Sequence, residues 1–406
     1  MSLARLRMDL DLMPSPVEDR PGLFVRDPFR YSEAQLIIPP PLVTLLRFFD
    51  GETPALEVRH ALVRSTGDLR AGEVLDQLSE ALDEAGFLEN DRFREMQDLR
   101  QREFAAAPVR VATHAGPGGY PADLAELRET FGGYLQESSV EPGEDVVGIA
   151  APHVSPFGGW ECYADAYRAI PASAAEKTFV VLGTSHYGAP DCFGLTRKAF
   201  ETPFGCTQPA LDLIDELERT ARPSVLMEDY CHAVEHSIEF QIAFLQHRFG
   251  PDIRVLPILC GSFAESILQG HLPERNDRVS RMFDTLAEIQ ARESDRLFWV
   301  LGIDMAHIGS RYDGPNSVSA FQDEMLDVQQ RDHHRIRAIE QSSASEFWSK
   351  VQENNDDLNW CGSSPVYTFL KSVAPALVGE TLRYGQWNID PESVVSFAAM
   401  RFKKKP

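Results

Sequence analysis

Three apolar runs near the middle of the sequence each end in polar side chains that can bind a metal or carry a proton. The run VVGIAAPH ends at His153, VVLGTSH ends at His186, and LFWVLGIDMAH ends at Asp304 and His307. Uninterrupted runs of Val, Ile, Leu and Phe are typical of strands that are buried on both faces of a sheet. Because ligands bind beyond the carboxyl ends of such strands, the pattern predicts one site at that edge of the sheet.

From Val109 onward, apolar runs alternate with segments of helical spacing. This alternation predicts an α/β domain over residues 108–406, with helices covering both faces of the sheet. Strands are expected at 145–153, 179–183, 254–261 and 297–304, and a further apolar stretch, SVVSFAAMRF, lies at 393–402. Helices are expected at 123–135, 161–170, 210–220, 235–249, 280–294, 325–340 and 366–374.

Residues 21–92 are predicted to form a small separate domain, after an N-terminal segment at 1–20 and before a charged helical linker at 93–107. The stretch LVTLLRFFDG suggests a short helix, Thr53-Pro54 begins a second one, and EVLDQLSEALDEAG forms a third that stops at Gly86. Phe87-Leu88 could then start a strand. Helices followed by a short strand indicate a winged helix.

This succession resembles the peptide-binding winged-helix domains of the PqqD-like type, which also close their long third helix with a step like Gly86-Phe87-Leu88-Glu89. The resemblance implies a peptide or protein partner for the N-terminal domain. Such a three-helix unit could equally be a cap on the main domain.

Charge and composition exclude several classes of protein. The 406 residues carry a formal net charge of -23, which argues against nucleic-acid binding because phosphate-tracking surfaces need clustered Lys and Arg. A small metal ion, or a neutral or cationic partner, suits that balance. The opening MSLARLRMDLDLMPSP does not fit a signal peptide, and no apolar run reaches the roughly 18 residues of a membrane helix. Six scattered cysteines without a CxxC pair predict a cytoplasmic protein with free thiols.

The best candidate ligands are His153, His186 and Cys361. His153 precedes a loop with two glycines, and His186 lies in the turn Gly-Thr-Ser-His-Tyr-Gly. Cys361 lies in NWCGSSPVY, just before an expected helix, where the helix N-terminus favours the thiolate. Two imidazoles and a thiolate predict an open metal site suited to Fe(II), Cu or Zn.

Further candidates could do acid–base work beside these ligands. Asp304 could orient an imidazole, and His307 could act as an acid or base. In VEHSIEF, Glu235 and Glu239 are expected one helical turn apart with His236 facing nearly the same way, although such a Glu pair could also be a solvated face. The remaining candidates have no spacing argument and are expected at the surface: His114, His232, His247, Asp332, His333 and His334.

Together the motifs resemble the MEMO-like family, known in prokaryotes as AmmeMemoRadiSam system protein B. The resemblance runs in order through APHVSPFGGW, LGTSHYG, FETPFG, EHSIEFQIAFLQ, VLPILCG, GIDMAH, CGSSPV and VVSFAAMRF, and it covers about residues 108–403. It implies a fold similar to the class III extradiol dioxygenases, which hold non-heme Fe(II) with two histidines and a carboxylate. In MEMO-like proteins the third position is a cysteine. Carried over motif by motif, the resemblance gives the metal ligands His153, His186 and Cys361, and the catalytic residues His307, Asp304, His236 and Glu235.

The sequence departs from the family pattern at three places. Val154-Ser155 stands where Ala-Gly is usual, and Phe157-Gly158-Gly159 stands where a Tyr-Ser-Gly step is usual. Gly302-Ile303 stands where Ser-Ser is usual, so two hydroxyls near the site are missing. The substrate could therefore differ from that of other members.

Three hypotheses follow from the residues and the resemblance. The first is a metal-dependent oxidoreductase that uses Fe(II) or Cu, with dioxygenase-like chemistry. The second is a peptide- or protein-binding module that uses the same cleft without turnover, since eukaryotic MEMO-like proteins are linked to phosphotyrosine-peptide binding. The third combines them: the N-terminal domain delivers a peptide to the metal site, or to a radical-SAM or AMMECR-like partner.

Overall fold

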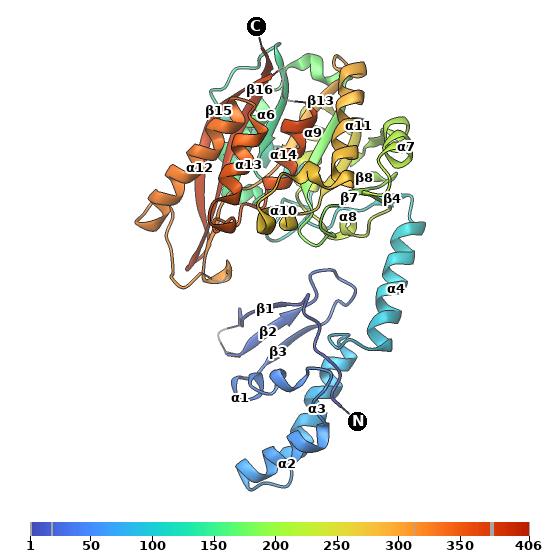
Figure 1. The fold of residues 1–406 in the computed structure, drawn as a ribbon, viewed down its shortest axis with the longest axis vertical. Coiled ribbons are helices and arrows are strands. Elements are labelled where there is room, and N and C mark those ends of the chain that lie inside the picture. The colour runs from blue at the N-terminus through green and yellow to red at the C-terminus, as the bar shows by residue number, and fades with distance from the viewer. Residues whose placement is uncertain (1, 18, 313, 374–376, 406) are drawn as a thin grey trace. The chain divides into compact units, whose positions relative to one another are not determined.

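The computed structural model describes residues 2–17, 19–312, 314–373 and 377–405 (Figure 1). The chain divides into two compact units, residues 1–106 and residues 107–406. Among the described residues, no helix combines the length and apolar character needed to cross a membrane.

The N-terminal unit contains a three-stranded antiparallel sheet in the order β1-β2-β3, followed by helices. Its elements are β1 (Asp11–Pro14), β2 (Leu23–Arg26), β3 (Gln35–Ile38), α1 (Pro40–Val43), the 3-10 helix η1 (Leu46–Phe48), α2 (Ala55–Thr66), α3 (Ala71–Glu84) and α4 (Asp91–Ala106). The apolar stripe predicted for the third helix is confirmed, because Leu75, Leu78 and Leu82 of α3 are buried. Gly86 has the left-handed φ of +69° expected where the helix stops.

This unit differs from the predicted order of helices followed by a strand. The sheet comes before the helices, and the expected strand at Phe87-Leu88 is only a single bridge between Leu88 and Leu6. The N-terminal segment is not separate, since β1 pairs with β2. The predicted linker also packs on this unit, because Met96 of α4 lies against Gly86.

The C-terminal unit is built on a ten-stranded sheet. Its main strands are β5 (Val146–Ala151), β6 (Thr178–Thr184), β12 (Arg254–Cys260), β13 (Leu297–Gly302), β15 (Leu377–Asp390) and β16 (Ser393–Lys404). The shorter strands of this unit are β4 (Val109–Arg110), β7 (Phe193–Leu195), β8 (Ala199–Thr202), β9 (Gly205–Cys206), β10 (Gln208–Pro209), β11 (Val225–Met227) and β14 (His307–Gly309). The ten-stranded order is β11-β7-β12-β6-β13-β5-β16-β14, with β10 beside β12 and β15 beside β16, while β4, β8 and β9 form a separate small sheet.

The centre of the large sheet is parallel and buried. β12, β6, β13 and β5 are neighbours and run in the same direction. Every residue of β5, β6 and β13 is buried, so the prediction from their apolar runs is confirmed. The long hairpin of β15 and β16 extends the sheet on the β5 side; neither of its strands was predicted.

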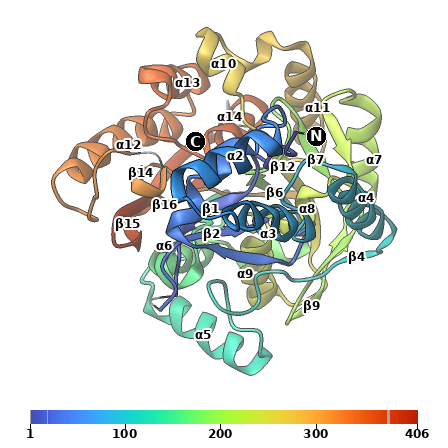
Figure 2. The same cartoon turned by 90° about the horizontal axis from the view of Figure 1, so that it is seen from below.

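Helices cover both faces of this sheet, as predicted. The longer helices are α5 (Leu124–Glu137), α6 (Pro156–Arg168), α7 (Leu211–Thr220), α9 (Glu239–Phe249), α11 (Asp277–Glu293), α12 (Glu324–Glu340), α13 (Ala344–Gln352) and α14 (Ser363–Ser372). The shorter ones are α8 (Cys231–Val234), α10 (Ala264–Gln269) and the 3-10 helices η2 (Ala172–Glu176), η3 (Pro273–Arg275), η4 (Ser310–Tyr312) and η5 (Glu353–Asn355). One apolar layer joins the sheet to α7 and α11–α14, and a second joins its other face to α5, α6 and α9 (Figure 2).

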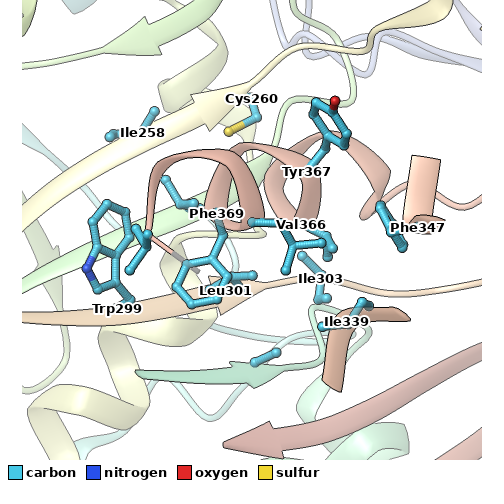
Figure 3. Close-up of a cluster of buried hydrophobic side chains, with 14 of the residues drawn as sticks. Ile258, Cys260, Trp299, Leu301, Ile303, Ile339, Phe347, Val366, Tyr367 and Phe369 are labelled. Atoms are coloured by element: carbon cyan, nitrogen blue, oxygen red, sulfur yellow. The ribbon is translucent and has the colours of Figure 1, made fainter. Parts of the chain in front are cut away.

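The helix that follows Cys361 is anchored firmly in the first of these layers. Figure 3 shows α14 lying across the strands, with Val366 and Phe369 among Trp299, Leu301 and Ile303. Burying a side chain of this size contributes about 1.5–3 kcal/mol. The helix, and therefore the residue just before it, is held in a fixed position relative to β13.

Candidate metal centre

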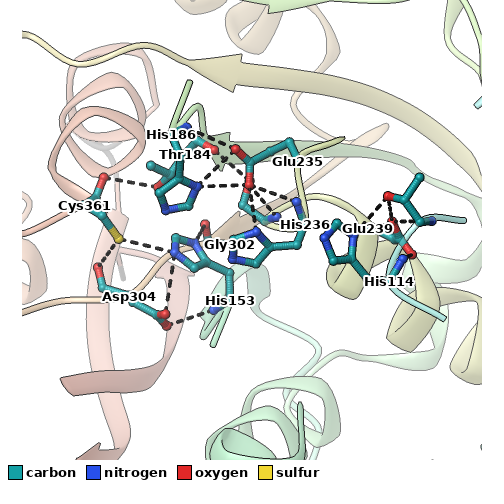
Figure 4. A network of polar contacts seen from close by, with 12 residues as sticks. His114, His153, Thr184, His186, Glu235, His236, Glu239, Gly302, Asp304 and Cys361 are labelled. Carbon is teal, nitrogen blue, oxygen red and sulfur yellow. Dashed lines mark hydrogen bonds and ion pairs between the residues drawn. The ribbon is translucent and has the colours of Figure 1, made fainter. Parts of the chain in front are cut away.

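Three predicted site residues converge at the carboxyl edge of the parallel strands. His153, His186 and Asp304 each stand two residues beyond the ends of β5, β6 and β13. These strands are adjacent in the order β6-β13-β5, so their carboxyl ends meet at one edge. Figure 4 shows the two imidazoles and the carboxylate gathered there with Cys361. The sheet therefore brings together residues that are up to 151 positions apart in the sequence.

Cys361 stands two residues before α14 and approaches the same cluster from that helix. Its Sγ lies 3.3 Å from Nε2 of His153 and 3.7 Å from the carbonyl oxygen of Asp304. Gly362 makes this approach possible, because a Cβ there would lie 2.6 Å from the same carbonyl oxygen. The glycine N–H instead donates a hydrogen bond to that oxygen.

The hydrogen bonds of the histidines fix which ring nitrogen is free. Nδ1 of His153 lies 2.9 Å from the carbonyl oxygen of Gly302, and Nδ1 of His307 lies 2.9 Å from that of Met305. A carbonyl oxygen only accepts, so both Nδ1 atoms must carry the proton. Nδ1 of His186 lies 3.0 Å from both carboxylate oxygens of Glu235. In the neutral form of each ring Nε2 is left with a lone pair, which is the arrangement that metal-binding histidines adopt.

His236 belongs to the same group of imidazoles. Its ring centroid lies 5.2 Å from that of His153 and 5.1 Å from that of His186. One nitrogen from each of these three rings lies within 4.8 Å of the others. The sequence suggested an acid–base residue at this position, and the structure shows that His236 is also close enough to be a ligand.

The predicted helix over 235–249 is wrong at its start, since α9 begins only at Glu239. Glu235 is extended instead, with a ψ of 135°. Its carboxylate accepts backbone N–H groups of His186, His236 and Ser237 at 2.9–3.1 Å. Side-chain bonds of this kind compete with helical hydrogen bonds and hold the segment open.

Electrostatics in the cluster favour a thiolate. Burial opposes charge on Cys361, but the neighbouring His153 and His307 outweigh it, so the pKa of the thiol lies well below its ordinary value. Burial also opposes the imidazolium of His153, yet Asp304 and Cys361 raise its pKa to about 9. Burial raises the pKa of Asp304. Among the described residues, no Lys or Arg side chain hydrogen-bonds or ion-pairs with Cys361 or Asp304.

The pair of His186 and Glu235 is polarised in the same way. Burial opposes both charges, but each group stabilises the other, so the pKa of His186 is raised and that of Glu235 is lowered. Burial lowers the pKa of His236, which keeps this ring neutral. For His307, burial is outweighed by Cys361, and its pKa is raised.

These groups suit a soft or borderline divalent cation. Nε2 atoms of His153 and His186 and the Sγ of Cys361 are the nitrogen and sulfur donors that Fe(II), Cu and Zn prefer. Among the described residues, only protonated imidazoles balance the negative charge on the half-buried sulfur. A bound cation would supply that balance and release the protons, because thiolate and neutral imidazole are the forms that bind metals.

Two expectations about neighbouring residues are wrong. Glu239 is fully buried rather than part of a solvated face, and His114, expected at the surface, is only partly exposed. The Glu239 carboxylate pairs with Arg110 and accepts the Tyr120 hydroxyl at 2.7 Å and the His114 N–H at 2.9 Å. The carboxylate thereby ties the segment before α5 to the start of α9.

Other residues expected at the surface are also buried. Nε2 of His232 lies 3.0 Å from the carbonyl oxygen of Gly194. Asp332 accepts hydrogen bonds from three side chains, those of Trp360, Tyr384 and Ser396. Its burial had a sequence signal, since position 332 shares a helical stripe with the apolar residues at 328 and 336. His247 and His333 are half-buried, and His334 is exposed as expected.

The structure also accounts for Gly302. A Cβ at this position would lie 2.2 Å from the carbonyl oxygen of Ser237. The segment that carries Glu235 and His236 therefore approaches β13 more closely than a serine at position 302 would allow.

Comparison with known proteins identifies a family that matches most of the C-terminal unit. A family model described as Memo-like protein matches residues 110–401. A MEMO1 family protein of Aquifex aeolicus is 26% identical over 383 residues, covering 93% of this chain and 95% of the relative. One of Thermus thermophilus is 26% identical over 260 residues, covering 63% and 72%, and one of Ignicoccus hospitalis is 32% identical over 151 residues, covering 34% and 52%.

The Aquifex alignment is longer than the C-terminal unit, which spans 107–406, and it therefore includes part of the N-terminal unit. The family model covers well over half of the sequence. The chain belongs to the Memo-like protein family.

Proposed function

We propose that the protein is a metal-dependent oxidoreductase that binds Fe(II), or alternatively Cu or Zn, through His153, His186 and Cys361. One observation carries the proposal: the half-buried Sγ of Cys361, whose thiol pKa lies well below its ordinary value, lies 3.3 Å from Nε2 of His153 and close to the ring of His186, and no Lys or Arg of the described residues balances its charge. Three protein ligands leave coordination positions open, which a catalytic metal needs for O2 or substrate.

Cys361 rather than His236 is proposed as the third ligand. Its sulfur lies 3.3 Å from Nε2 of His153, and its negative charge gains most from a cation. His236 remains neutral, with Nδ1 3.2 Å from Glu235, and can exchange a proton with substrate.

The other residues have supporting roles in this proposal. Glu235 holds the His186 ring in position through Nδ1. Asp304 fixes the backbone of His153 by accepting its N–H at 2.9 Å. His307 contributes a proton donor or acceptor beside the sulfur, since its Nδ1 is already engaged with a carbonyl oxygen. When bound, the metal would supply a redox centre that activates O2, by analogy with extradiol dioxygenases.

The test is O2 uptake by protein purified anaerobically and loaded separately with Fe(II), Cu(II) or Zn(II), in the presence of a chemical reductant. We expect consumption with Fe(II) or Cu and none with the redox-inactive Zn. Cys361→Ala should abolish it, and the exposed Cys206→Ala serves as the matched control. Equal uptake by the two cysteine variants would overturn the proposal.

A partner for the N-terminal unit is part of the same proposal. Residues 1–106 form a compact unit with its own apolar core, which is what a separate recognition module requires. We propose that it binds a peptide or protein, with a radical-SAM or AMMECR-like protein as the partner class that the family resemblance implies. Deleting residues 1–105 should then abolish partner binding and leave metal content unchanged. A cytoplasmic location is proposed with it, because all six cysteines are unpaired.

A further inference from the structure

A cavity of 240 Å³ opens onto the candidate metal centre from the side of α14. His186 and Cys361, which approach the centre from different elements in Figure 4, both line it. A group that enters this cavity therefore meets two of the three proposed ligands. Within the cluster His153 and Asp304 are only 1% and 2% exposed, whereas His236 and His307 are partly exposed.

Three large aromatic side chains form part of the cavity wall. Phe263, Trp348 and Trp360 line it, together with Ile267 from α10. An engineered apolar cavity of about 150 Å³ holds benzene, so a cavity of this size can take a planar ring system. Aromatic walls favour such rings through edge and stacking contacts.

The charged groups of the cavity select against anions. None of the described residues that line it is Lys or Arg, and its acidic residue is Asp356. Asp356 pairs with Arg335 at 2.7 Å through one oxygen and accepts the backbone N–H of Trp360 through the other. Its remaining lone pairs can accept a hydrogen bond from a ligand. In the metal-free cavity a negatively charged group would face this carboxylate and the Cys361 sulfur, and the described lining residue that can carry a positive charge, His186, is already paired with Glu235.

The cavity also offers hydroxyl groups. Ser364 is 5% exposed, and its Oγ, like that of the exposed Ser262, has no hydrogen-bond partner among the described residues. Both hydroxyls can donate to or accept from a bound molecule. Ser364 lies in the first turn of α14 and therefore beside the positive end of that helix.

We propose that this cavity binds the organic substrate, and that the substrate presents a nitrogen-containing aromatic ring that is uncharged or cationic. The N–H group of such a ring donates to Asp356, and the ring packs between the tryptophan and phenylalanine side chains. Carboxylated or phosphorylated rings are disfavoured by charge in the metal-free cavity. The proposal rests on the metal centre for its chemistry, but the binding itself requires only the cavity.

The test compares three probes with the same ring and different charge: indole, tryptamine and indole-3-acetate. Binding to the full-length protein is measured at pH 8 by calorimetry and ligand-observed NMR, with and without metal. We expect indole and tryptamine to bind at least about tenfold more tightly than indole-3-acetate. Asp356→Asn should reduce the preference for tryptamine over indole-3-acetate by several-fold.

Two variants that fill the cavity locate the binding. Ala264→Phe and Ile267→Trp, both at half-buried positions of α10, should each weaken indole binding by at least about tenfold. Leu268→Trp, on the same helix but 75% exposed, should leave it unchanged and controls for surface aromatic groups. Indole-3-acetate binding as tightly as tryptamine, or indole binding that survives both filled-cavity variants, would overturn the proposal.

Metal content measured on the same samples separates this inference from the proposed function. If the protein holds metal but does not bind indole, the metal centre stands and the proposed role of the cavity is refuted. A protein that binds indole in the cavity but never holds metal refutes the oxidoreductase and supports the cavity as a binding site.

Discussion

Two buried polar clusters lie side by side at the start of α9, and they balance their charges differently. Around Glu239, the chain provides its own cation, because the Arg110 guanidinium pairs with the carboxylate. Around Cys361, the described residues provide only histidines, whose charge depends on a proton. The first cluster is complete as it stands and has a structural role. The second gains from a metal ion, which is why we assign function to it.

The largest expected effect is a loss of folding stability when the Glu239 cluster is disrupted. Glu239→Gln leaves the buried Arg110 without its counter-charge, and we expect the free energy of unfolding to fall by about 3–5 kcal/mol. The measurement is denaturant unfolding of metal-free protein. The exposed Glu201→Gln is the matched control. Metal-free Cys361→Ala should change the unfolding free energy by much less; a loss as large as that of Glu239→Gln would erase the distinction between the clusters.

Metal binding should stabilise the folded protein only through the cluster around Cys361. At a free metal concentration about a thousandfold above the dissociation constant, the unfolding free energy should rise by about 4 kcal/mol. This gain should disappear in Cys361→Ala and persist in Glu239→Gln, although the latter starts from a lower stability. Thermal unfolding with and without a chelator measures it. A gain that is lost in both variants would mean that the clusters act as one site.

The carboxylate that orients His186 should matter for affinity. Glu235→Gln should weaken metal binding by about 10–100-fold, because the partner of a ligating imidazole fixes its orientation and basicity. Competition with a calibrated chelator measures the change. Glu239→Gln is the comparison variant, since its carboxylate contacts His114 rather than a proposed ligand. Similar losses in the two variants would contradict separate roles for the two glutamates.

The smallest effect on stability is expected for an exposed Arg–Glu pair, that of Arg401 and Glu380. Hydrogen bonds from Arg401 lower the pKa of Glu380 to about 2. The ion pair therefore stabilises the folded state above the carboxyl's ordinary pKa of about 4.5, and that stability is lost as the pH falls towards 2. Because Glu380 is 45% exposed, Glu380→Gln should cost less than about 1 kcal/mol at neutral pH. Unfolding at pH 7 and pH 3 should show the variant and wild type converging in acid; a constant difference would contradict this account.

Part of the centre could be predicted from sequence because its residues follow the ends of recognisable strands. His153, His186 and Asp304 each follow an apolar run, and parallel neighbouring strands bring such positions to one edge. Cys361 was placed by its motif and by its position before an expected helix. In contrast, sequence spacing gave no sign that His114 and Arg110 meet Glu239, because these contacts join segments more than 120 residues apart.

Local patterns also failed where side chains override them. EHSIEFQIAFLQHRF has continuous helical spacing, yet the carboxylate of Glu235 captures backbone N–H groups and delays the helix to Glu239. The strand β15 mixes polar and apolar residues without an apolar run, and most of its residues are half-buried, so it was not predicted. In the N-terminal unit, the short strands before the helices lack the length that would have marked them as a sheet.

Metal content tests the central claim most directly. Wild-type protein, His186→Ala, Cys361→Ala and the Cys206→Ala control are purified anaerobically, and iron, copper and zinc per chain are measured by mass spectrometry. The account predicts near-stoichiometric metal in the wild type and the control, and its loss in the other two variants. His236→Ala, measured beside them, should retain metal. Wild-type protein without metal, or metal that persists in both His186→Ala and Cys361→Ala, would contradict the metal centre.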